Sequence, residues 1–505
     1  MLENVKALFY VLALAAPAFY LGRRIVGSTI ANREFAVWRN AWFAVTIAAF
    51  LCGDFFVFAM VAVMVCIYAH SVRAATVALF FILLFAAPSV KVLIPGFAGI
   101  NTLMEINYAR VLVIALLIPI LLTGGIVRKN VHAFAAPDWL IVSYVLLTSA
   151  LEFRNTEVTN VLRVATVQLL DVLVPYFAFS RAVTSMADFR KVCIAVVIGL
   201  LPNALIAVFE IAKYWHVYMG IVNSWGGIVL SPYAERDGLL RAFGSASGSI
   251  ILGYILMVAI GCMLVVRHTM LSRRTEMIAL VILAAGLVAS LSRGPWVGTG
   301  VLLVMYVATG PNAVTNLGKL AAIGIVTMAA LLLTPVGQKL LDFLPFVGTV
   351  DVGNVDYRKQ LFESALIVIQ RNLWIGSVDF RLAPEMQELI QGQGIIDIVN
   401  HYLKLALDYG LVGLGCFLAF FATILIGLRR VLKFSTFRNS ELNVCARAAM
   451  STLLAILVTL GTASSIDFIP YVYWSFGGLC VALVRIAYKE RAAVARGAYA
   501  RQIAV

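Results

Sequence analysis

The sequence predicts an all-α fold, a polytopic bundle of about 14 membrane-spanning helices with one long outer loop that carries short helices. Hydrophobic residues make up 62% of the 505 residues and charged residues only 13%, whereas a soluble domain holds about 25% charged residues. The mean hydropathy of +0.97 agrees with this. Stretches of about 20 mainly apolar residues, long enough to cross a bilayer, recur roughly fourteen or fifteen times.

The net charge of +14 comes from basic clusters in short loops between the expected spans, where the positive-inside rule explains them without a nucleic-acid partner. This rule places the C-terminus in the cytoplasm. Residues 39–71 read either as two short spans around "CGD" or as one long span, so the side of the N-terminus stays open. The segments expected to face outward are 95–108, 154–162, 213–243, 292–294, 336–400 and 464–467.

Two arginines stand at the outer mouths of expected spans, against the positive-inside bias. Arg293 lies in "ASLSRGPWVGTG" and Arg241 in "LLRAFGSASGS", each followed by glycines that permit close backbone approach or a broken helix. An ionisable residue at membrane depth indicates function, although a single arginine can also reach lipid phosphate from the interface. The pair predicts a polar cavity on the outer side that attracts anions.

The outer loop contains "DYRKQLFESALIVIQRNLW", which predicts a helix on the outer surface with Asp356 as N-cap and Arg358 turned toward the membrane. Its apolar face consists of Leu361, Ala365, Val368 and Ile369.

His401 is the candidate general base. Helical spacing would place Asp397, His401, Lys404 and Asp408 on one face. A carboxylate one turn away can fix the tautomer of a histidine and raise its pKa, which suits a base near neutral pH. Of five histidines, only this one and His216 are expected to face outward.

Other embedded polar residues have two interpretations. Asp171, Arg163, Asn203 and Glu210 either line the same cavity or hydrogen-bond between helices, the commoner role. The sequence "YVYW", residues 471–474, indicates an outer aromatic belt.

The motifs of several chemistries are absent. The chain has no GxxxxGK[ST] loop, no HExxH, no CxxC pair and no carboxylate cluster with metal-ligand spacing, so we expect neither a metal nor a cofactor. Chemistry by arginines and a histidine within the membrane points to a phosphate-bearing lipid, because arginine makes bidentate contacts to phosphate.

Four stretches resemble the O-antigen ligase and Wzy-type polymerase superfamily: "RAFGSASGSIILGYIL", "LSRGPWVG", "YRKQLFESALIVIQRNLWIG" and "NHYLKLALDYGLVGLGCFL". The resemblance implies a GT-C-like architecture in the bacterial inner membrane. It also implies metal-independent transfer of a glycan from undecaprenyl pyrophosphate to an acceptor hydroxyl on the periplasmic side, with inversion of the anomeric centre.

The resemblance also implies roles for particular residues. Arg241 and Arg293 would bind the pyrophosphate, Arg358 would be a further phosphate or glycan contact, and His401 would activate the acceptor. Asp397 and Asn400 would support them. The ligases of the family usually have His followed by Asn, whereas here Asn400 precedes His401, an order more like that of exopolysaccharide polymerases.

We therefore expect a polymerase of lipid-linked repeat units that makes a surface polysaccharide or exopolysaccharide. The expected partners are the donor, the glycan acceptor, membrane lipids and a regulator of chain length. The alternatives are a ligase acting on lipid A core or protein, and a lipid-linked oligosaccharide flippase or transporter. We divide the chain into N-terminal spans (1–235), spans with the arginine segments (236–335), a periplasmic loop (336–400), and C-terminal spans with a basic tail (401–505).

Overall fold

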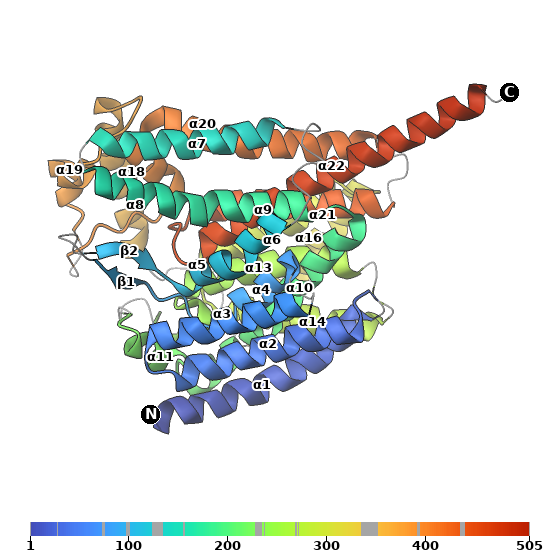
Figure 1. Ribbon diagram of the computed structural model, residues 1–505, viewed down its shortest axis with the longest axis horizontal. Coiled ribbons are helices and arrows are strands. Elements are labelled where there is room, and N and C mark those ends of the chain that lie inside the picture. Colours follow the sequence, from blue (N-terminus) through green and yellow to red (C-terminus); the bar gives the residue numbers. More distant parts are fainter. Residues whose placement is uncertain are drawn as a thin grey trace.

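The computed structural model shows a mainly helical molecule whose long helices run side by side (Figure 1). It describes residues 2–27, 29–72, 76–96, 102–123, 135–154, 157–227, 235–236, 238–267, 270, 272–334, 352–390, 394–434 and 440–503. The strands within these ranges form two short antiparallel hairpins, β1 (Val92–Pro95) with β2 (Thr102–Ile106) and β3 (Glu235–Arg236) with β4 (Leu239–Leu240). The prediction of a helical fold is confirmed.

The helices of the N-terminal half are α1 (Leu2–Val26), α2 (Asn32–Leu51), α3 (Phe55–Ser71), α4 (Val77–Leu84), α5 (Tyr108–Leu112), α6 (Ile118–Thr123), α7 (Ala136–Leu151), α8 (Val158–Gln168), α9 (Val174–Ala182), α10 (Met186–Lys213) and α11 (Met219–Ser224). Single π-helical turns, Val113–Leu117 and Leu169–Leu173, join α5 to α6 and α8 to α9.

The helices of the C-terminal half are α13 (Ser249–Val266), α14 (Arg273–Ala289), α15 (Arg293–Ala308), α16 (Ala313–Leu332), α18 (Val352–Arg371), α19 (Pro384–Gln387), α20 (His401–Phe434), α21 (Glu441–Leu460) and α22 (Phe468–Ile503). Residues 336–351 and 391–393 of the expected outer loop lie outside the described residues. Asp356 was predicted to cap the outer helix, but α18 begins at Val352, so this prediction was wrong.

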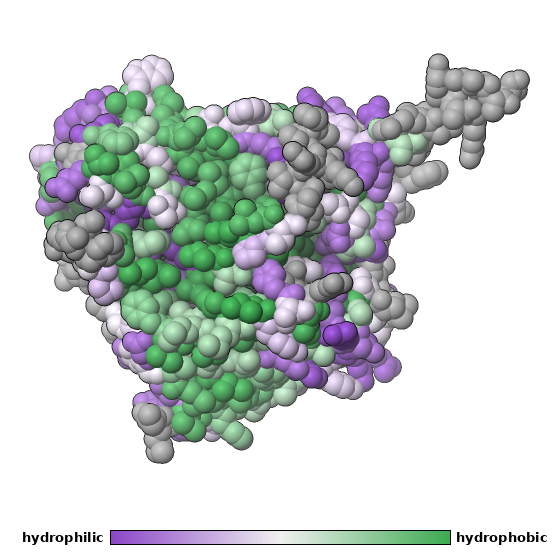
Figure 2. Space-filling view, in the orientation of Figure 1, coloured by the Kyte–Doolittle hydropathy of each residue, from purple (hydrophilic) through white to green (hydrophobic). Residues whose placement is uncertain are grey.

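Eight helices in the described ranges are long and apolar enough to cross a membrane: Glu3–Val26, Val158–Ala182, Met186–Lys213, Ser249–Val266, Ala313–Ala330, His401–Lys433, Glu441–Leu460 and Phe468–Ala493. Hydrophobic residues gather over the middle of the face in Figure 2, and hydrophilic residues lie toward both ends of the helices. This distribution is typical of a multi-pass membrane protein. The count of about 14 spans and the GT-C-like class stay predictions.

Several segments that the sequence places outside the membrane gather at one end of the molecule. The β1–β2 hairpin, α11, α18 and α19 all lie toward the left of Figure 1, and the C-terminus lies at the right. Residues 39–71 form two helices, because the chain turns at 52–54 and the Asp54 carboxylate accepts hydrogen bonds from the N–H groups of Phe56 and Val57 at the start of α3.

A buried ion-pair cluster joins α7, α9 and α22. The Asp138 carboxylate accepts hydrogen bonds at 2.7 Å from both Arg181 and Arg485, and at 2.6 Å from the Tyr176 hydroxyl. Since an unpaired charge at this depth is costly, the shared carboxylate stabilises the packing of the three helices.

Helix α20 is interrupted at Gly410, whose φ of 66° and ψ of −166° are not helical. The backbone of residues 373–377 lies against this break and pairs with both sides of it, through Leu411 N to Leu373 O (2.8 Å) and Ser377 N to Leu407 O (2.8 Å). A Cβ at position 410 would lie 2.3 Å from the carbonyl carbon of Trp374, so only glycine fits.

The outer segments have a hydrophobic core of their own. The predicted apolar face of α18 is buried in it, as are side chains from α19 and from the first part of α20. The core therefore extends across the expected boundary between residues 400 and 401. Its members are Leu361, Ala365, Val368, Ile369, Phe380, Met386, Leu389, Ile398, Leu403, Ala406 and Leu407.

Candidate active site

Arg241 lies at the start of an irregular segment, residues 241–248, that leads into α13. Two polar side chains of α10 hold the backbone of this segment. The Glu210 carboxylate accepts hydrogen bonds from Phe243 N (2.8 Å) and Gly244 N (2.9 Å), and the Asn203 side chain accepts one from Ser245 N (3.0 Å). Non-helical backbone at membrane depth needs such partners, so both residues act on the backbone of the arginine segment.

The arginine segment brings Arg241 against the turn that carries Arg293. The guanidinium of Arg241 is 6% exposed and donates a hydrogen bond from Nη2 to the Ser292 hydroxyl at 3.0 Å. Ala242 N also donates to Ala289 O at 3.1 Å. Arg241 therefore lies beside the turn that carries Arg293, although the two residues are 52 positions apart in the chain.

The Arg293 turn packs against the connection between α21 and α22. A Cβ at Gly294 would lie only 2.2 Å from the Thr462 hydroxyl oxygen, so this glycine permits close approach of the two segments. Two residues further on, the Ser464 hydroxyl donates to Ile398 O at 2.9 Å and lies 3.5 Å from an Asp397 carboxylate oxygen. The connection thus links the Arg293 turn to the segment before His401.

Arg358 joins this group from α18. Its neighbour Tyr357 donates its hydroxyl to Asp397 O at 3.0 Å and accepts from Asp397 N at 3.1 Å. Desolvation by the surrounding protein lowers the pKa of the Arg358 guanidinium. The Asp397 charge opposes this shift and the Arg293 charge adds to it. Arginine stays protonated under such shifts, so the cluster holds several positive charges and one carboxylate.

Asn400 and His401 form the beginning of α20. The Asn400 side chain accepts hydrogen bonds from Tyr402 N (2.9 Å) and Leu403 N (3.2 Å), which makes it the N-cap. Asp397 precedes the helix, so the predicted shared face of Asp397 and His401 was wrong. The cap explains the difference, because a capped helix begins after its cap residue. The Lys404–Asp408 pair does form, at 2.5 Å.

The His401 ring is 6% exposed and packs among aromatic side chains, 5.2 Å from the Phe417 ring and 6.1 Å from the Tyr473 ring. Neither ring nitrogen has a hydrogen-bond partner among the described residues, so the predicted tautomer-fixing bond to Asp397 is also missing. Buried polar atoms without partners are rare and need an explanation, and a bound group is one such explanation.

The other outward histidine supports the arginine segment. His216 stacks on Phe243 with ring centroids 4.2 Å apart, and its Nδ1 lies 3.7 Å from the Glu210 carboxylate. His216 is thus part of the packing beneath residues 243 and 244.

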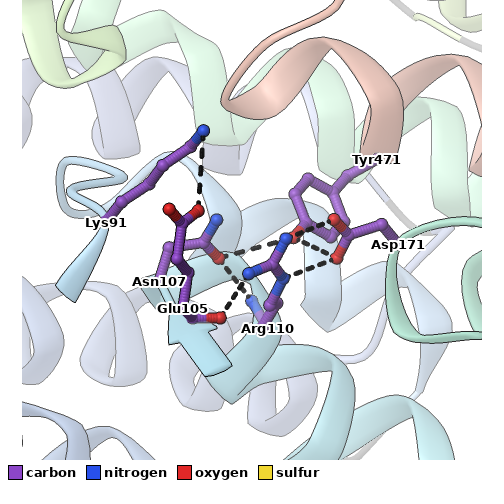
Figure 3. A network of polar contacts seen from close by, with 6 residues as sticks. All are labelled: Lys91, Glu105, Asn107, Arg110, Asp171 and Tyr471. Atoms are coloured by element: carbon purple, nitrogen blue, oxygen red, sulfur yellow. Dashed lines mark hydrogen bonds and ion pairs between the residues drawn. The ribbon is translucent and has the colours of Figure 1, made fainter. Parts of the chain in front are cut away.

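Asp171 belongs to a second polar network (Figure 3). Its carboxylate takes two hydrogen bonds from Arg110, at 2.9 and 2.8 Å, and one from the Tyr471 hydroxyl at 2.6 Å. Tyr471, Tyr473 and Trp474 are at most 3% exposed, so the prediction of an outer aromatic belt was wrong. The contacts of these three side chains lie inside the bundle. Tyrosine and tryptophan have an apolar body and one polar group, so the same sequence pattern suits a buried position as well as an interface.

Sequence reasoning missed Arg110, Tyr357, Ser292 and Ser464. A signal existed for the first, since "NYARVLVIALL" places one arginine in an apolar run. It also missed Asp467, in the turn before α22, where burial raises the pKa of the carboxyl to about 6 despite the opposing charge of Lys91.

The apolar belt, the long helices and the buried ion pairs define a multi-pass membrane protein. Residues 278–418 match the family model described as O-Antigen ligase, which confirms the resemblance to the O-antigen ligase and Wzy superfamily and supports a ligase-type or polymerase-type function. No curated protein matches the chain. The matched range contains Arg293, Arg358 and His401, and Arg241 lies upstream of it.

Proposed function

We propose that this protein is a glycosyltransferase that polymerises lipid-pyrophosphate-linked repeat units into a surface polysaccharide or exopolysaccharide. The observation that carries the proposal is that Arg241 contacts the 292–294 turn that carries Arg293. The 462–464 connection and Asp397 link this turn to Arg358 and to the segment directly before His401. The gathering of the expected outward segments at one end supports a site on the periplasmic side of the bacterial inner membrane.

The arginines would hold the leaving group. As the bond between the anomeric carbon and the pyrophosphate oxygen breaks, the lipid pyrophosphate takes the electron pair and gains negative charge. Fixed guanidinium groups can stabilise that charge without reorganising. Arg241 is set by Ser292 and by the backbone contacts of Glu210, and Arg358 by the Tyr357–Asp397 contact next to it.

His401 would be the general base. One ring nitrogen takes the proton of the acceptor hydroxyl while its oxygen forms the new bond to the anomeric carbon, on the face opposite the leaving group, so the centre inverts. The unpartnered nitrogens of His401 leave an acceptor atom for that proton. Asn400 would support the base by fixing where the helix begins, and Asp397 by balancing part of the charge of Arg358.

A ligase that moves the glycan to lipid A core or to protein is the second candidate, and the matched family's description favours it. The order of Asn400 and His401 favours the polymerase through the resemblance described above. The two candidates share the donor chemistry and differ only in the acceptor.

The test is a product-length gel from purified protein in nanodiscs that receives only its host's lipid-linked repeat unit. A ladder that disappears in His401→Ala and persists in His70→Ala supports a polymerase with His401 as its base. A single unchanged band, followed by transfer when lipid A core is added, would establish the ligase instead. No transfer to either acceptor would refute the proposal and leave a transporter.

A matched arginine series tests the leaving-group role. Arg293→Lys should lose transfer as completely as Arg293→Ala, because a point charge cannot replace a bidentate fork. Arg371→Lys is the control, since Arg371 makes an exposed ion pair with Glu385 in the same outer layer. Full activity of Arg293→Lys would contradict the role.

A further inference from the structure

We propose that a cavity between the β1–β2 hairpin and α8 is a binding subsite for one or two sugar units of the glycan. The proposal rests on the proposed function, since it assumes that the protein handles a glycan. The cavity has a volume of about 350 Å³, at the lower end of the range of small-molecule sites. It lies outside the arginine and histidine cluster described above.

Both walls of the cavity carry polar and apolar side chains. Asn160, Arg163, Val164 and Val167 line it from α8 at spacings of three and four residues, which puts them on one helical face. The other wall is formed by the hairpin and by Arg110 of α5. A sugar ring has hydroxyls at its edge and C–H groups on its faces, so it fits a cavity whose lining mixes polar and apolar groups.

The polar groups suit a hydroxylated ligand better than a phosphate. The guanidinium groups of Arg110 and Arg163 donate, the Glu105 carboxylate accepts, and the Asn160 amide does both. Arg110 is already paired with Asp171. Glu105 pairs with Lys91 at 3.8 Å and places a carboxylate in the lining, which would repel an anion. A neutral ligand with several hydroxyls meets no such repulsion.

The polar groups of the lining are fixed in advance. Figure 3 shows Arg110 held by Asp171 and by the carbonyl of Glu105. Arg163 donates from Nε to Leu103 O (2.8 Å) and from Nη2 to Thr102 O (2.6 Å), which ties α8 to the hairpin. Three of its five N–H groups are used in described hydrogen bonds, and two remain for a ligand. Groups held in this way lose little entropy when they bind.

Side chains at the start of α22 link the lining of the cavity to the candidate active site. Tyr471 bonds to the Asp171 carboxylate that holds Arg110. Two residues later, the Tyr473 ring lies 6.1 Å from His401 and its hydroxyl lies 3.1 Å from that of Ser465. A glycan that reaches across this turn would have one end at the arginine cluster and a more distant sugar in the cavity.

The test measures equilibrium binding of the oligosaccharide released from the host's lipid-linked repeat unit by pyrophosphate hydrolysis, with full-length protein in nanodiscs. Val164→Trp fills the cavity from α8 without removing any of its polar side chains. The control is Leu162→Trp on the same helix, where the side chain is 62% exposed. We expect Val164→Trp to weaken binding at least about tenfold, and the control to bind as the wild type does.

Glu105→Gln is a milder second variant that keeps the side-chain shape. It should weaken oligosaccharide binding by about five- to tenfold, because a charged acceptor is lost. Binding of inorganic phosphate would instead strengthen if the cavity were an anion site. Unchanged oligosaccharide affinity in both variants, or tighter phosphate binding in Glu105→Gln, overturns the proposal.

The two proposals can fail separately. His401→Ala should abolish transfer and leave oligosaccharide binding unchanged. Transfer that survives in His401→Ala refutes the proposed base, whatever the cavity binds. Normal transfer and normal product length in Val164→Trp, with unchanged oligosaccharide binding, refutes the subsite alone.

Discussion

Replacing Glu210 by glutamine tests how the arginine segment is held. The carboxylate is fully buried and accepts three backbone hydrogen bonds, from Phe243 and Gly244 on one oxygen and from Val217 on the other. Glutamine has one acceptor oxygen, so its NH₂ group would face an N–H donor. An unsatisfied buried donor costs about 1–3 kcal/mol, and the two remaining bonds lose their charge assistance.

We therefore expect Glu210→Gln to lower the free energy of opening of the segment by about 3 kcal/mol, which corresponds to about a hundredfold. Hydrogen–deuterium exchange in nanodiscs, followed at Phe243 and Gly244, measures this directly. Transfer should fall with it, because Arg241 lies two residues before Phe243.

The control is Glu441→Gln, since Glu441 is 46% exposed and pairs with Arg190 away from this segment. It should leave exchange at residues 243 and 244 unchanged. Exchange in Glu210→Gln within about threefold of the wild type would refute the reasoning, because a loss that small amounts to less than one ordinary hydrogen bond.

Three further changes have defined outcomes. The raised pKa of Asp467, about 6, means that the folded protein binds this proton more tightly than the unfolded chain, so stability falls as the pH rises from about 4 through about 6. A plot of melting temperature against pH should lose this slope in Asp467→Asn. An unchanged slope in the variant would contradict the raised pKa of Asp467. Gly410→Ala should destabilise the protein by at least about 2 kcal/mol, since φ is positive and Trp374 blocks the added carbon. The control is Gly415→Ala, whose added carbon meets no atom within 4 Å, and it should be neutral or slightly stabilising in the same melting assay. Asp171→Ala leaves Arg110 buried without its carboxylate and should lower the free energy of unfolding by about 3–5 kcal/mol. Adding Arg110→Met should recover part of this loss. Equal melting temperatures for the wild type, Asp171→Ala and the double variant would contradict a stabilising role of the ion pair.

The sequence allowed the fold class to be predicted because apolar runs of span length carry their own signal. It also identified Arg241 and Arg293, since charges at the ends of such runs are rare enough to notice. The apolar face of α18 followed from its spacing alone, and all four of its residues are buried.

Other features depend on contacts between distant segments and could not be read from local patterns. Nothing near Glu210 in the sequence indicates that three backbone N–H groups would turn toward it. The start of α20 was misplaced because the helical spacing of Asp397 and His401 was considered without the competing N-cap at Asn400. Tyr471 looked like an interface residue because its partner, Asp171, lies 300 positions away.

The break at Gly410 lies where the outer layer of α18 and α19 meets the membrane helices. Residues 401–409 share a hydrophobic core with α18 and α19, and the 373–377 backbone fastens them to that outer layer. Arg241 and Arg293 are anchored instead to α10 and to the start of α15. Arg358 belongs to the outer layer, whereas the His401 ring also packs on Phe417 and Tyr473 of the membrane helices. A displacement of the outer layer would therefore change the distance of Arg358 from Arg241 and Arg293, and His401 lies where the two parts meet.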